Sequence, residues 1–378
     1  MKIIFLSADF PPMLSGMGDY GKNLAVSLKN IGYDIRVLTS GMESADAEAD
    51  LPVLRSIRSW DETAWPIIRN IVSKLSPDIF HFQYMTSTFC GQPFANFLPE
   101  LLKKEFPKLR IVTTYHEFAA PLKRLLLWPI LRSSDAHIVT NDRHLEMLKM
   151  MKFFLRLRGP VEKIPLAANV PVMQISEQRI RELRLEMGVG EKDFLFVRFG
   201  ILHDIILPYL YKLADIFIKA RAGGLPVKLL LIGKAEVKAK HAMMNKIDLS
   251  ENAGVILRND LSLEEISAYL HASNAGLGIY PDGVSEKRTA LLALFAHGLP
   301  VIGTTRGKLP DEFRNGENLL TLNINAGEAD WIELLSRVAG DQSLRKKLSS
   351  EARKTASGHD WSCIARQTGE LYRKVLQP

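Results

Sequence analysis

Residues 285–290, which read Ser-Glu-Lys-Arg-Thr-Ala, carry side chains suited to binding a charged ligand. Lys287 and Arg288 supply positive charge, while Ser285 and Thr289 supply hydroxyl groups. An arginine can donate two hydrogen bonds to one phosphate, and helix N-termini attract anions. Cations at such a terminus are unfavourable by roughly 0.3–1 kcal/mol, so a bound anion would account for them. The pattern favours a phosphate site over a solvated helix start, which remains the alternative.

The elements around this segment form a strand–loop–helix–strand unit. An apolar strand is expected over 275–280, followed by a short amphipathic helix that ends at Gly298 and a second strand that Pro300 opens. In such a unit the helix N–H groups lie at the carboxyl edge of a parallel sheet, where anionic ligands bind.

Strands and helices alternate along the whole chain, which predicts an α/β protein with two Rossmann-like, doubly wound parallel sheets facing a cleft. We expect an N-terminal domain over 1–170, a hinge around 169–190 and a C-terminal domain over 185–358. The helix at 360–378 is expected to pack back on the first domain. Ser262 and Glu265 form a capping box that begins one helix of the second domain. The expected strands are 2–7, 33–39, 78–83, 109–115, 136–139, 194–199, 227–232 and 255–257.

Two loops of the first domain carry further candidates. Gly16 and Gly18 follow the first strand and allow a close backbone approach to a ligand, although two glycines can also serve only to turn the chain. His116 and Glu117 follow the strand 109–115, where a histidine can exchange a proton near neutral pH. His81, inside an apolar strand, is expected to be a hydrogen-bonded core residue.

Composition limits the function classes. The chain has 378 residues, 47% hydrophobic residues, 24% charged residues and a net charge of +7, which suits a globular protein with anionic partners. No apolar run is long enough to span a bilayer. Two cysteines, Cys90 and Cys363, make neither a disulfide framework nor a metal set, which favours a cytoplasmic location. No nucleic-acid-binding motif accompanies the charge, so no nucleic-acid partner is expected.

The run Ala296-His-Gly-Leu-Pro-Val301 resembles the end of the signature of family 4 retaining glycosyltransferases, and the loop with Gly16 and Gly18 resembles the opening of that family. The resemblance implies a GT-B fold and a nucleotide-sugar donor. The chain departs from the family at several functional positions. Ala293 replaces one glutamate and Glu286 is displaced by one residue from the other. The usual arginine and lysine after the first strand of the second domain are Ile201 and Ile206.

The resemblance also implies a residue set for each role. His116, Glu117 and Glu286 are the expected catalytic residues, and the base is expected near the loops that contain Gly233 and Arg258. The expected donor-binding residues are Gly16, Gly18, Arg198, Gly200, Gly233, Lys234, Arg258, Leu261, Ser285, Lys287, Arg288, Thr289 and Ala290.

The resemblance thus implies a retaining, metal-independent hexosyltransferase that uses a UDP-sugar in polysaccharide assembly. No cofactor or metal is expected, since no Asp-x-Asp motif occurs. Its acceptor would be a glycan or a lipid-linked sugar. Two stretches that mix basic and apolar residues, 122–132 and 148–158, suggest peripheral contact with the inner face of the cell membrane, although helices packed under the sheet explain them equally well. The alternatives are a degenerate GT-B protein that binds without catalysis, a nucleotide-sugar epimerase and a Rossmann oxidoreductase.

Overall fold

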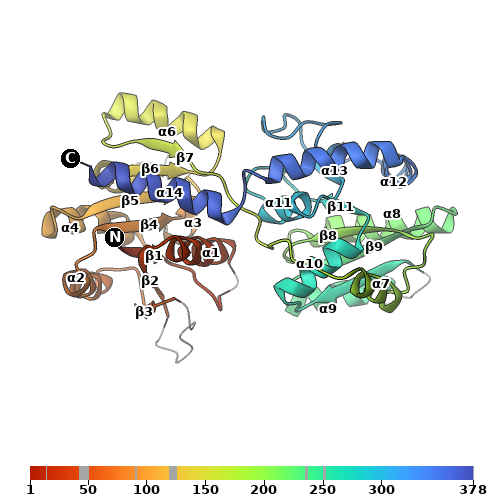
Figure 1. The fold of residues 1–378 in the computed structure, drawn as a ribbon, viewed down its shortest axis with the longest axis horizontal. Coiled ribbons are helices and arrows are strands. Elements are labelled where there is room, and N and C mark those ends of the chain that lie inside the picture. Colours follow the sequence, from red (N-terminus) through yellow and green to blue (C-terminus); the bar gives the residue numbers. More distant parts are fainter. Residues whose placement is uncertain are drawn as a thin grey trace. The chain divides into compact units, whose positions relative to one another are not determined.

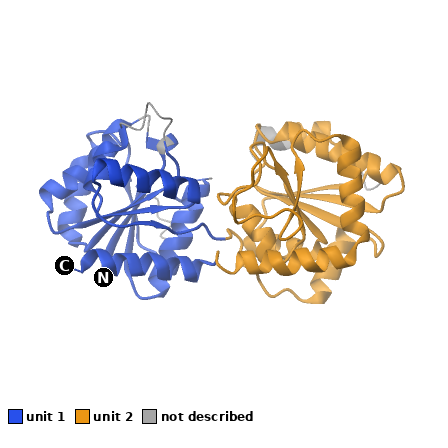
Figure 2. Ribbon diagram, turned by 90° about the horizontal axis from the view of Figure 1, so that it is seen from above, with its two compact units in different colours: residues 1–167, 360–378 blue, residues 168–359 orange. Residues whose placement is uncertain are grey.

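The computed structural model describes residues 1–13, 15–41, 51–89, 92–118, 126–234, 237–249 and 253–377. The chain divides into two compact units (Figure 2). Unit 1 consists of Met1–Ala167 and Asp360–Pro378, and unit 2 consists of Ala168–His359. The segment 169–190, where a hinge is expected, directly follows the boundary between the units, lies in unit 2 and contains helix α7 (Glu177–Glu186).

Unit 1 contains a seven-stranded parallel sheet in the order β3-β2-β1-β4-β5-β6-β7. Strand order reverses beside β1, because β2 and β4 lie on either side of it. The loops that follow β1 and β4 therefore diverge at the carboxyl edge and leave room for a ligand. The strands are β1 (Lys2–Ser7), β2 (Asp34–Ser40), β3 (Val53–Ile57), β4 (Ile79–Tyr84), β5 (Arg110–Tyr115), β6 (Ala136–Val139) and β7 (Val161–Lys163).

Helices pack on this sheet, and the C-terminal helix is one of them. Helix α14 (Trp361–Leu376) packs against α1 (Gly16–Asn30), although the two are far apart in the sequence (Figure 1). The apolar face of α14, which includes Ile364 and Leu371, is buried there. The other helices of the unit are α2 (Ala64–Leu75), α3 (Thr86–Phe89), η1 (Pro93–Phe97), α4 (Leu98–Glu105), α5 (Trp128–Ser133) and α6 (Asp142–Leu155).

Unit 2 contains a six-stranded parallel sheet in the order β10-β9-β8-β11-β12-β13. Two parallel, Rossmann-like α/β units are thus present, which confirms the predicted α/β class with two doubly wound sheets. The strands are β8 (Phe194–Phe199), β9 (Val227–Gly233), β10 (Val255–Asn259), β11 (Ala275–Gly278), β12 (Val301–Thr305) and β13 (Leu320–Asn323).

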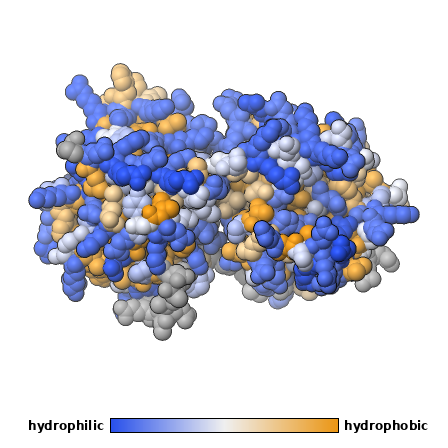
Figure 3. Space-filling view, in the orientation of Figure 1, coloured by the Kyte–Doolittle hydropathy of each residue, from blue (hydrophilic) through white to orange (hydrophobic). Residues whose placement is uncertain are grey.

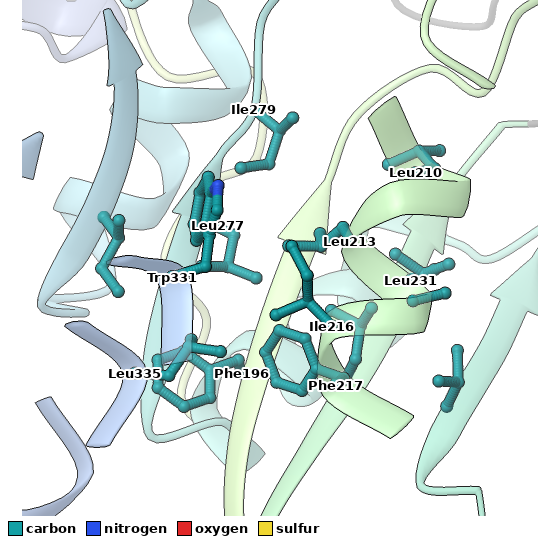
Figure 4. Packing of buried hydrophobic residues seen from close by; sticks show 14 of the residues in the cluster. Phe196, Leu210, Leu213, Ile216, Phe217, Leu231, Leu277, Ile279, Trp331 and Leu335 are labelled. Atoms are coloured by element: carbon teal, nitrogen blue, oxygen red, sulfur yellow. The ribbon is translucent and has the colours of Figure 1, made fainter. Parts of the chain in front are cut away.

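Alternate residues of the strands in unit 2 form separate cores on the two faces of the sheet. Phe196 joins one cluster, where it packs with Phe217 and Trp331 (Figure 4). Its strand neighbours Leu195 and Val197 join the other. Both faces are covered by helices, as a doubly wound sheet requires. These helices are α7, α8 (Leu207–Ala222), α9 (Val237–Lys246), α10 (Leu263–Ala272), α11 (Thr289–Ala296), α12 (Glu328–Gly340) and α13 (Gln342–Ala356).

Helix α11 differs from its prediction in one respect. It ends before Gly298, which has a φ of +69° that favours glycine, as expected. It is not amphipathic, however, because its residues from Leu291 to Phe295 are all buried. The helix packs against α13 and against the sheet, so none of its faces through that run meets solvent.

One other local prediction has a clear outcome. The capping box of α10 is confirmed: Glu265 N–H donates to the Ser262 hydroxyl oxygen at 3.2 Å, and the Glu265 carboxylate accepts from Ser262 N–H at 2.8 Å. Residues 93–105 form two successive helices, η1 and α4, with Pro99 in the first turn of α4. Among the described residues, no helix has the length and apolar character to cross a bilayer.

Candidate functional site

Two glycine loops touch at the carboxyl edge of the sheet in unit 2. Gly200 follows β8 and Gly233 ends β9, and the N–H of Gly200 donates to the Ile232 carbonyl at 3.1 Å. Gly233 has a φ of +147°, and a Cβ placed on it would lie 2.1 Å from the Gly200 carbonyl oxygen. Only glycine fits there. At this point of the edge the two loops therefore meet through backbone rather than side-chain atoms.

Arg198 is buried beneath these loops. Its side chain is 3% exposed, and Nη1 donates to the Gly200 carbonyl at 2.7 Å and to the Ile201 carbonyl at 3.2 Å. Burial lowers the pKa of the Arg198 guanidinium to about 10, so it remains charged at neutral pH. Among the described residues no carboxylate pairs with it. Arg198 thus holds the loop in place and adds an uncompensated positive charge under it.

Arg288 is the second cation of this edge. Its guanidinium carbon lies 4.7 Å from the centre of the Tyr280 ring, and Nη2 donates to the Asp282 carboxylate. Its charge also lowers the pKa of Arg198, which indicates that the two guanidinium groups are near each other. The Nε of Arg288 is buried without a hydrogen-bond partner in the described part of the chain. The Asp282 side chain, in contrast, is 70% exposed, so an anionic ligand can replace it as the partner of Arg288.

The rest of segment 285–290 surrounds the start of α11. Thr289 and Ala290 begin the helix, so their N–H groups have no partners within it. Ala290 also approaches Gly200, since its Cβ lies 3.6 Å from where a Cβ of that glycine would be. Ser285 is half-buried and its carbonyl accepts from the N–H of Arg288, whereas Glu286 is buried and Lys287 is exposed. The two predicted cations therefore differ: Arg288 faces the cluster and Lys287 lies on the surface.

The residues expected near a base lie on the adjacent strands. Arg258 pairs in register with Ile232 of β9, and its Nη1 donates to the Leu257 carbonyl at 2.9 Å. Leu261, half-buried, packs against the core under the loop. Lys234 is exposed, and its carbonyl accepts from Leu202 N–H at 2.9 Å. Lys234 thus shapes the loop through its backbone.

In unit 1, the first helix begins at the glycine loop. Gly16 is exposed at the start of α1, whereas Gly18 is buried, and a Cβ added to it would lie only 3.2 Å from the Phe10 backbone. Ser15 caps the helix by accepting from Gly18 N–H at 3.4 Å, and its hydroxyl donates to the Asp9 carboxylate at 2.8 Å. A carboxylate beside this helix start disfavours a phosphate. A cation also reaches this loop, because Arg55 donates to the Pro11 carbonyl.

His116 lies at the end of β5, as its position in the sequence predicts. Its Nε2 is 2.7 Å from the Gln83 side-chain oxygen, and its ring packs edge-on against Tyr20 with centroids 4.8 Å apart. Because a glutamine oxygen only accepts, Nε2 carries the proton and donates. The carboxylate of the neighbouring residue Glu117 accepts a hydrogen bond from the Ser87 N–H at 3.1 Å.

A buried hydrogen-bond chain connects His116 with the C-terminal helix. Gln83 uses its oxygen for His116 and its nitrogen for His81 Nε2, at 2.9 Å. The His81 Nδ1 then donates to the Tyr372 hydroxyl, and Thr114 contacts Nε2 at 2.8 Å. Burial lowers the pKa of His81 to about 3, which keeps it neutral. The expectation that His81 is a hydrogen-bonded core residue is confirmed.

The structure groups the predicted site residues into two sets. In unit 2, Arg198, Gly200, Gly233, Arg288 and Ala290 come together at one edge. In unit 1, Gly18 and His116 are connected through the first turns of α1 by Tyr20. Sequence reasoning missed three contributors: Gln83, Tyr20 and Tyr280. Gln83 had a signal, because His81 and Gln83 are polar residues two apart in an apolar strand and so share one face. Within the described ranges, no three His, Cys, Asp or Glu side chains gather as metal ligands would.

Comparison with known proteins now adds to this geometry. No family model matches the sequence, and neither does any curated protein sequence. Solved structures do match over nearly the whole chain. HepE from Anabaena in complex with UDP superposes with a TM-score of 0.72 at 16% identity, covering 99% of this chain and 100% of that one. The fold is GT-B.

Two further structures agree. Sucrose-phosphate synthase from Thermosynechococcus elongatus has a TM-score of 0.70 and 18% identity, and covers 99% of this chain and 98% of its own. A glycosyltransferase from Rickettsia africae has a TM-score of 0.72 and 14% identity, with coverage of 100% and 98%. At such low identities the GT-B likeness establishes the architecture, and the function must be argued from the site.

Proposed function

We propose that this GT-B protein is a glycosyltransferase that moves a hexose from a nucleotide-diphosphate sugar, with UDP as the nucleotide, to a glycan or lipid-linked acceptor. The observation that carries the proposal is the cation cluster of unit 2. Arg288 stacks on Tyr280 beside the start of α11, and the buried Arg198 adds charge under Gly200. This cluster lies at the carboxyl edge of a parallel sheet, where anionic ligands bind, and HepE, which has a similar fold, was solved in complex with UDP.

The proposed chemistry follows from charge. When the bond between the sugar and the diphosphate breaks, negative charge grows on the leaving phosphate, and preorganised donors stabilise it. Arg288 would exchange Asp282 for the phosphate, and the N–H groups of Thr289 and Ala290 would donate beside it. Arg198 would act indirectly, by fixing the Gly200 loop against Gly233. In this proposal the leaving phosphate accepts the acceptor's proton on the same face of the sugar, so the reaction retains stereochemistry and needs no metal.

Unit 1 is proposed to bind the acceptor. His116 presents an oriented imidazole at the end of β5, and Asp9 places a carboxylate beside the start of α1. Acceptor hydroxyls donate readily to such groups, whereas a diphosphate would be repelled by Asp9. Polysaccharide assembly at the inner face of the cell membrane is the setting that suits a glycan or lipid-linked acceptor.

A second candidate function is donor binding without catalysis. Asp282 holds Arg288, and Ala293, which stands where the family has a carboxylate, is fully buried. A protein that had lost its transfer activity would also show such changes. The glycine loops and the uncompensated Arg198 charge would then serve binding alone.

One experiment separates these functions. The purified chain is incubated with UDP-, GDP- and ADP-sugars, and nucleotide release and the heat of binding are measured together. Release of UDP from a UDP-sugar supports the transferase. Binding without release across glycan and lipid-linked acceptors supports the binding protein. Tight binding of NADH with no binding of UDP would overturn both and indicate an oxidoreductase.

A further inference from the structure

Helix α6 of unit 1 ends in an apolar surface that faces solvent. Phe153 is 80% exposed and Phe154 71%, and Met150, one turn earlier, is 57% exposed. Phe153 is the most exposed large hydrophobic residue in the described part of the chain. An apolar patch is visible over α6 at the top of unit 1, with hydrophilic residues around it (Figure 3). We call Met150, Phe153, Phe154 and Leu155 the α6 patch.

The side chains of the α6 patch do not belong to the hydrophobic core of unit 1. The inner face of α6 already packs through Leu148, and the chain after the helix packs through Leu157, both of them buried in the hydrophobic core of unit 1. Gly159 then fixes the following turn, because a Cβ on it would lie 1.8 Å from the Asp135 carbonyl oxygen. The helix end is therefore held firmly from inside, and its outer face presents aromatic rings where a surface helix normally carries polar groups.

Positive charge surrounds these rings. Lys149, Arg156 and Arg158 are all exposed, whereas Glu146 is the exposed acid on the same face, about one turn toward the N-terminus. Lys152 is engaged with the Gly159 carbonyl and closes the helix end. The two phenyl rings pack edge to face, with centroids 5.4 Å apart, so they form one protruding group.

We propose that the α6 patch docks unit 1 on a membrane surface that contains anionic lipids, with Phe153 and Phe154 inserted at the level of the headgroups. Aromatic side chains flanked by lysine and arginine bind such surfaces through burial of apolar area together with charge attraction. This names the residues for the membrane contact in the proposed function, but it does not depend on the transfer reaction.

The other basic and apolar stretch does not compete for this role. Of residues 122–132, those from 122 to 125 lie outside the described part of the chain, and in α5 Pro129, Ile130 and Leu131 are buried in the core. The packed-helix alternative therefore holds for α5, whereas α6 divides into a packed face and an exposed one.

The test is sedimentation of the full chain with lipid vesicles. Vesicles of phosphatidylcholine mixed with phosphatidylglycerol are compared with vesicles of phosphatidylcholine alone. The wild-type chain should bind the anionic vesicles, and binding should weaken in high salt. The double variant Phe153→Ser/Phe154→Ser should bind at least about tenfold more weakly, since it removes two large apolar groups. The variant Lys149→Glu/Arg158→Glu should lose the preference for anionic vesicles.

The matched control is Leu185→Ser, which removes an apolar side chain that is 75% exposed on α7 of unit 2. It should bind like the wild type. A Phe153→Trp variant should show blue-shifted emission on the vesicles and quenching by brominated lipids. Urea unfolding should be unchanged in all variants, because the altered side chains are exposed.

Equal vesicle binding by the wild type and the double serine variant would overturn the proposal, and so would no binding by either. A concentration-dependent dimer that the double variant abolishes, without vesicle binding, would assign the α6 patch to a second copy and also overturn it. UDP affinity is measured on the same variants and should not change. Failure of the wild type to bind UDP would contradict the donor proposal only. The vesicle measurements would still decide whether the α6 patch binds a membrane.

Discussion

Two neighbours, one aromatic and one acidic, hold the Arg288 guanidinium in position. The Tyr280 ring holds one face of the guanidinium, and the Asp282 carboxylate holds its edge. Because Tyr280 is buried and Asp282 is exposed, the ring contact is the permanent one. The guanidinium is thus kept close to the start of α11 and can change its anionic partner without changing its place.

Removal of this side chain should weaken donor binding. We expect Arg288→Ala to reduce the affinity for UDP by about 1–3 kcal/mol, the scale of a lost charged hydrogen bond. Arg288→Lys should recover part of the loss, because it restores charge but not the planar fork. Titration calorimetry measures both. Arg314→Ala serves as the control, since Arg314 is an exposed arginine 69% accessible and paired with Glu317. An affinity of Arg288→Ala equal to that of this control would remove Arg288 from the site.

The close approach of Gly233 to Gly200 gives a second prediction. Gly233→Ala should destabilise unit 2 by roughly 1–3 kcal/mol or more, because it adds a clash with the Gly200 carbonyl to a strained φ. Gly224→Ala is a matched control: Gly224 also has a positive φ, of +92°, but a Cβ added there would have nothing within 4 Å. Urea unfolding should show a clearly larger loss for Gly233→Ala. Equal losses would mean that the two loops do not touch as described.

At the scale of elements, α14 acts on His116 through the interior of unit 1. The Tyr372 hydroxyl accepts from His81, and His81 accepts from the Gln83 amide that orients His116. Tyr372 is therefore a positioning residue, separated from the sheet edge by two side chains. Such a chain of buried hydrogen bonds also fixes which nitrogen of His116 carries its proton.

We expect Tyr372→Phe to cost about 1–3 kcal/mol of stability, because it leaves the buried His81 N–H without its acceptor. Glycosyl transfer should fall as well, while UDP affinity stays unchanged, since the proposed donor residues lie in unit 2. Tyr33→Phe is the control: Tyr33 packs against the same helix and accepts from Arg373 at 3.4 Å, but it has no part in the chain to His116. A change in the His116 imidazole NMR signal should accompany the first variant alone. If both variants leave that signal in place, Tyr372 does not position His116.

The sequence predicted the elements better than their details. Alternating strands and helices were sufficient for the parallel sheets, and Ser262 with Glu265 located the start of α10. Helix α7 was missed because its polar sequence, with a single buried leucine, gives a weak apolar period. Strand β7 was missed because it is three residues long at the sheet edge.

The orientation of side chains was harder to predict from the sequence than the positions of helices and strands. The inward turn of Arg198 depends on carbonyl groups of the Gly200 loop, which a linear pattern does not reveal. The pairing of Arg288 with Asp282 and its stacking on Tyr280 likewise depend on how the 280–288 loop folds. His116 could be placed at a strand end, but its partner Gln83 lies on a different strand. Which of these residues lie near one another was therefore predictable in part, and the orientation of each side chain was not.

For the whole molecule, buried histidines should make stability depend on pH. Burial lowers the pKa of His81 to about 3 and the pKa values of His137 and His297 to about 4. The unfolded chain, with histidine pKa values near 6.5, then binds more protons than the folded chain below that pH. Stability should therefore fall as pH drops from about 6.5 toward 4, by up to about 2 kcal/mol per histidine at pH 5.

Urea unfolding at pH 7.5 and at pH 5 tests this prediction. The exposed His241 provides a control, because His241→Gln should leave the pH dependence unchanged. The same stability at both pH values would show that the three imidazoles are not buried in their neutral form.

The most direct test of the account is a crystal structure of the chain grown with saturating UDP. We predict that the diphosphate lies at the start of α11, within hydrogen-bond distance of the Arg288 guanidinium and of the Thr289 and Ala290 N–H groups, with Asp282 released. A nucleotide bound elsewhere, or an Arg288 that still holds Asp282 with no phosphate beside it, would contradict the account.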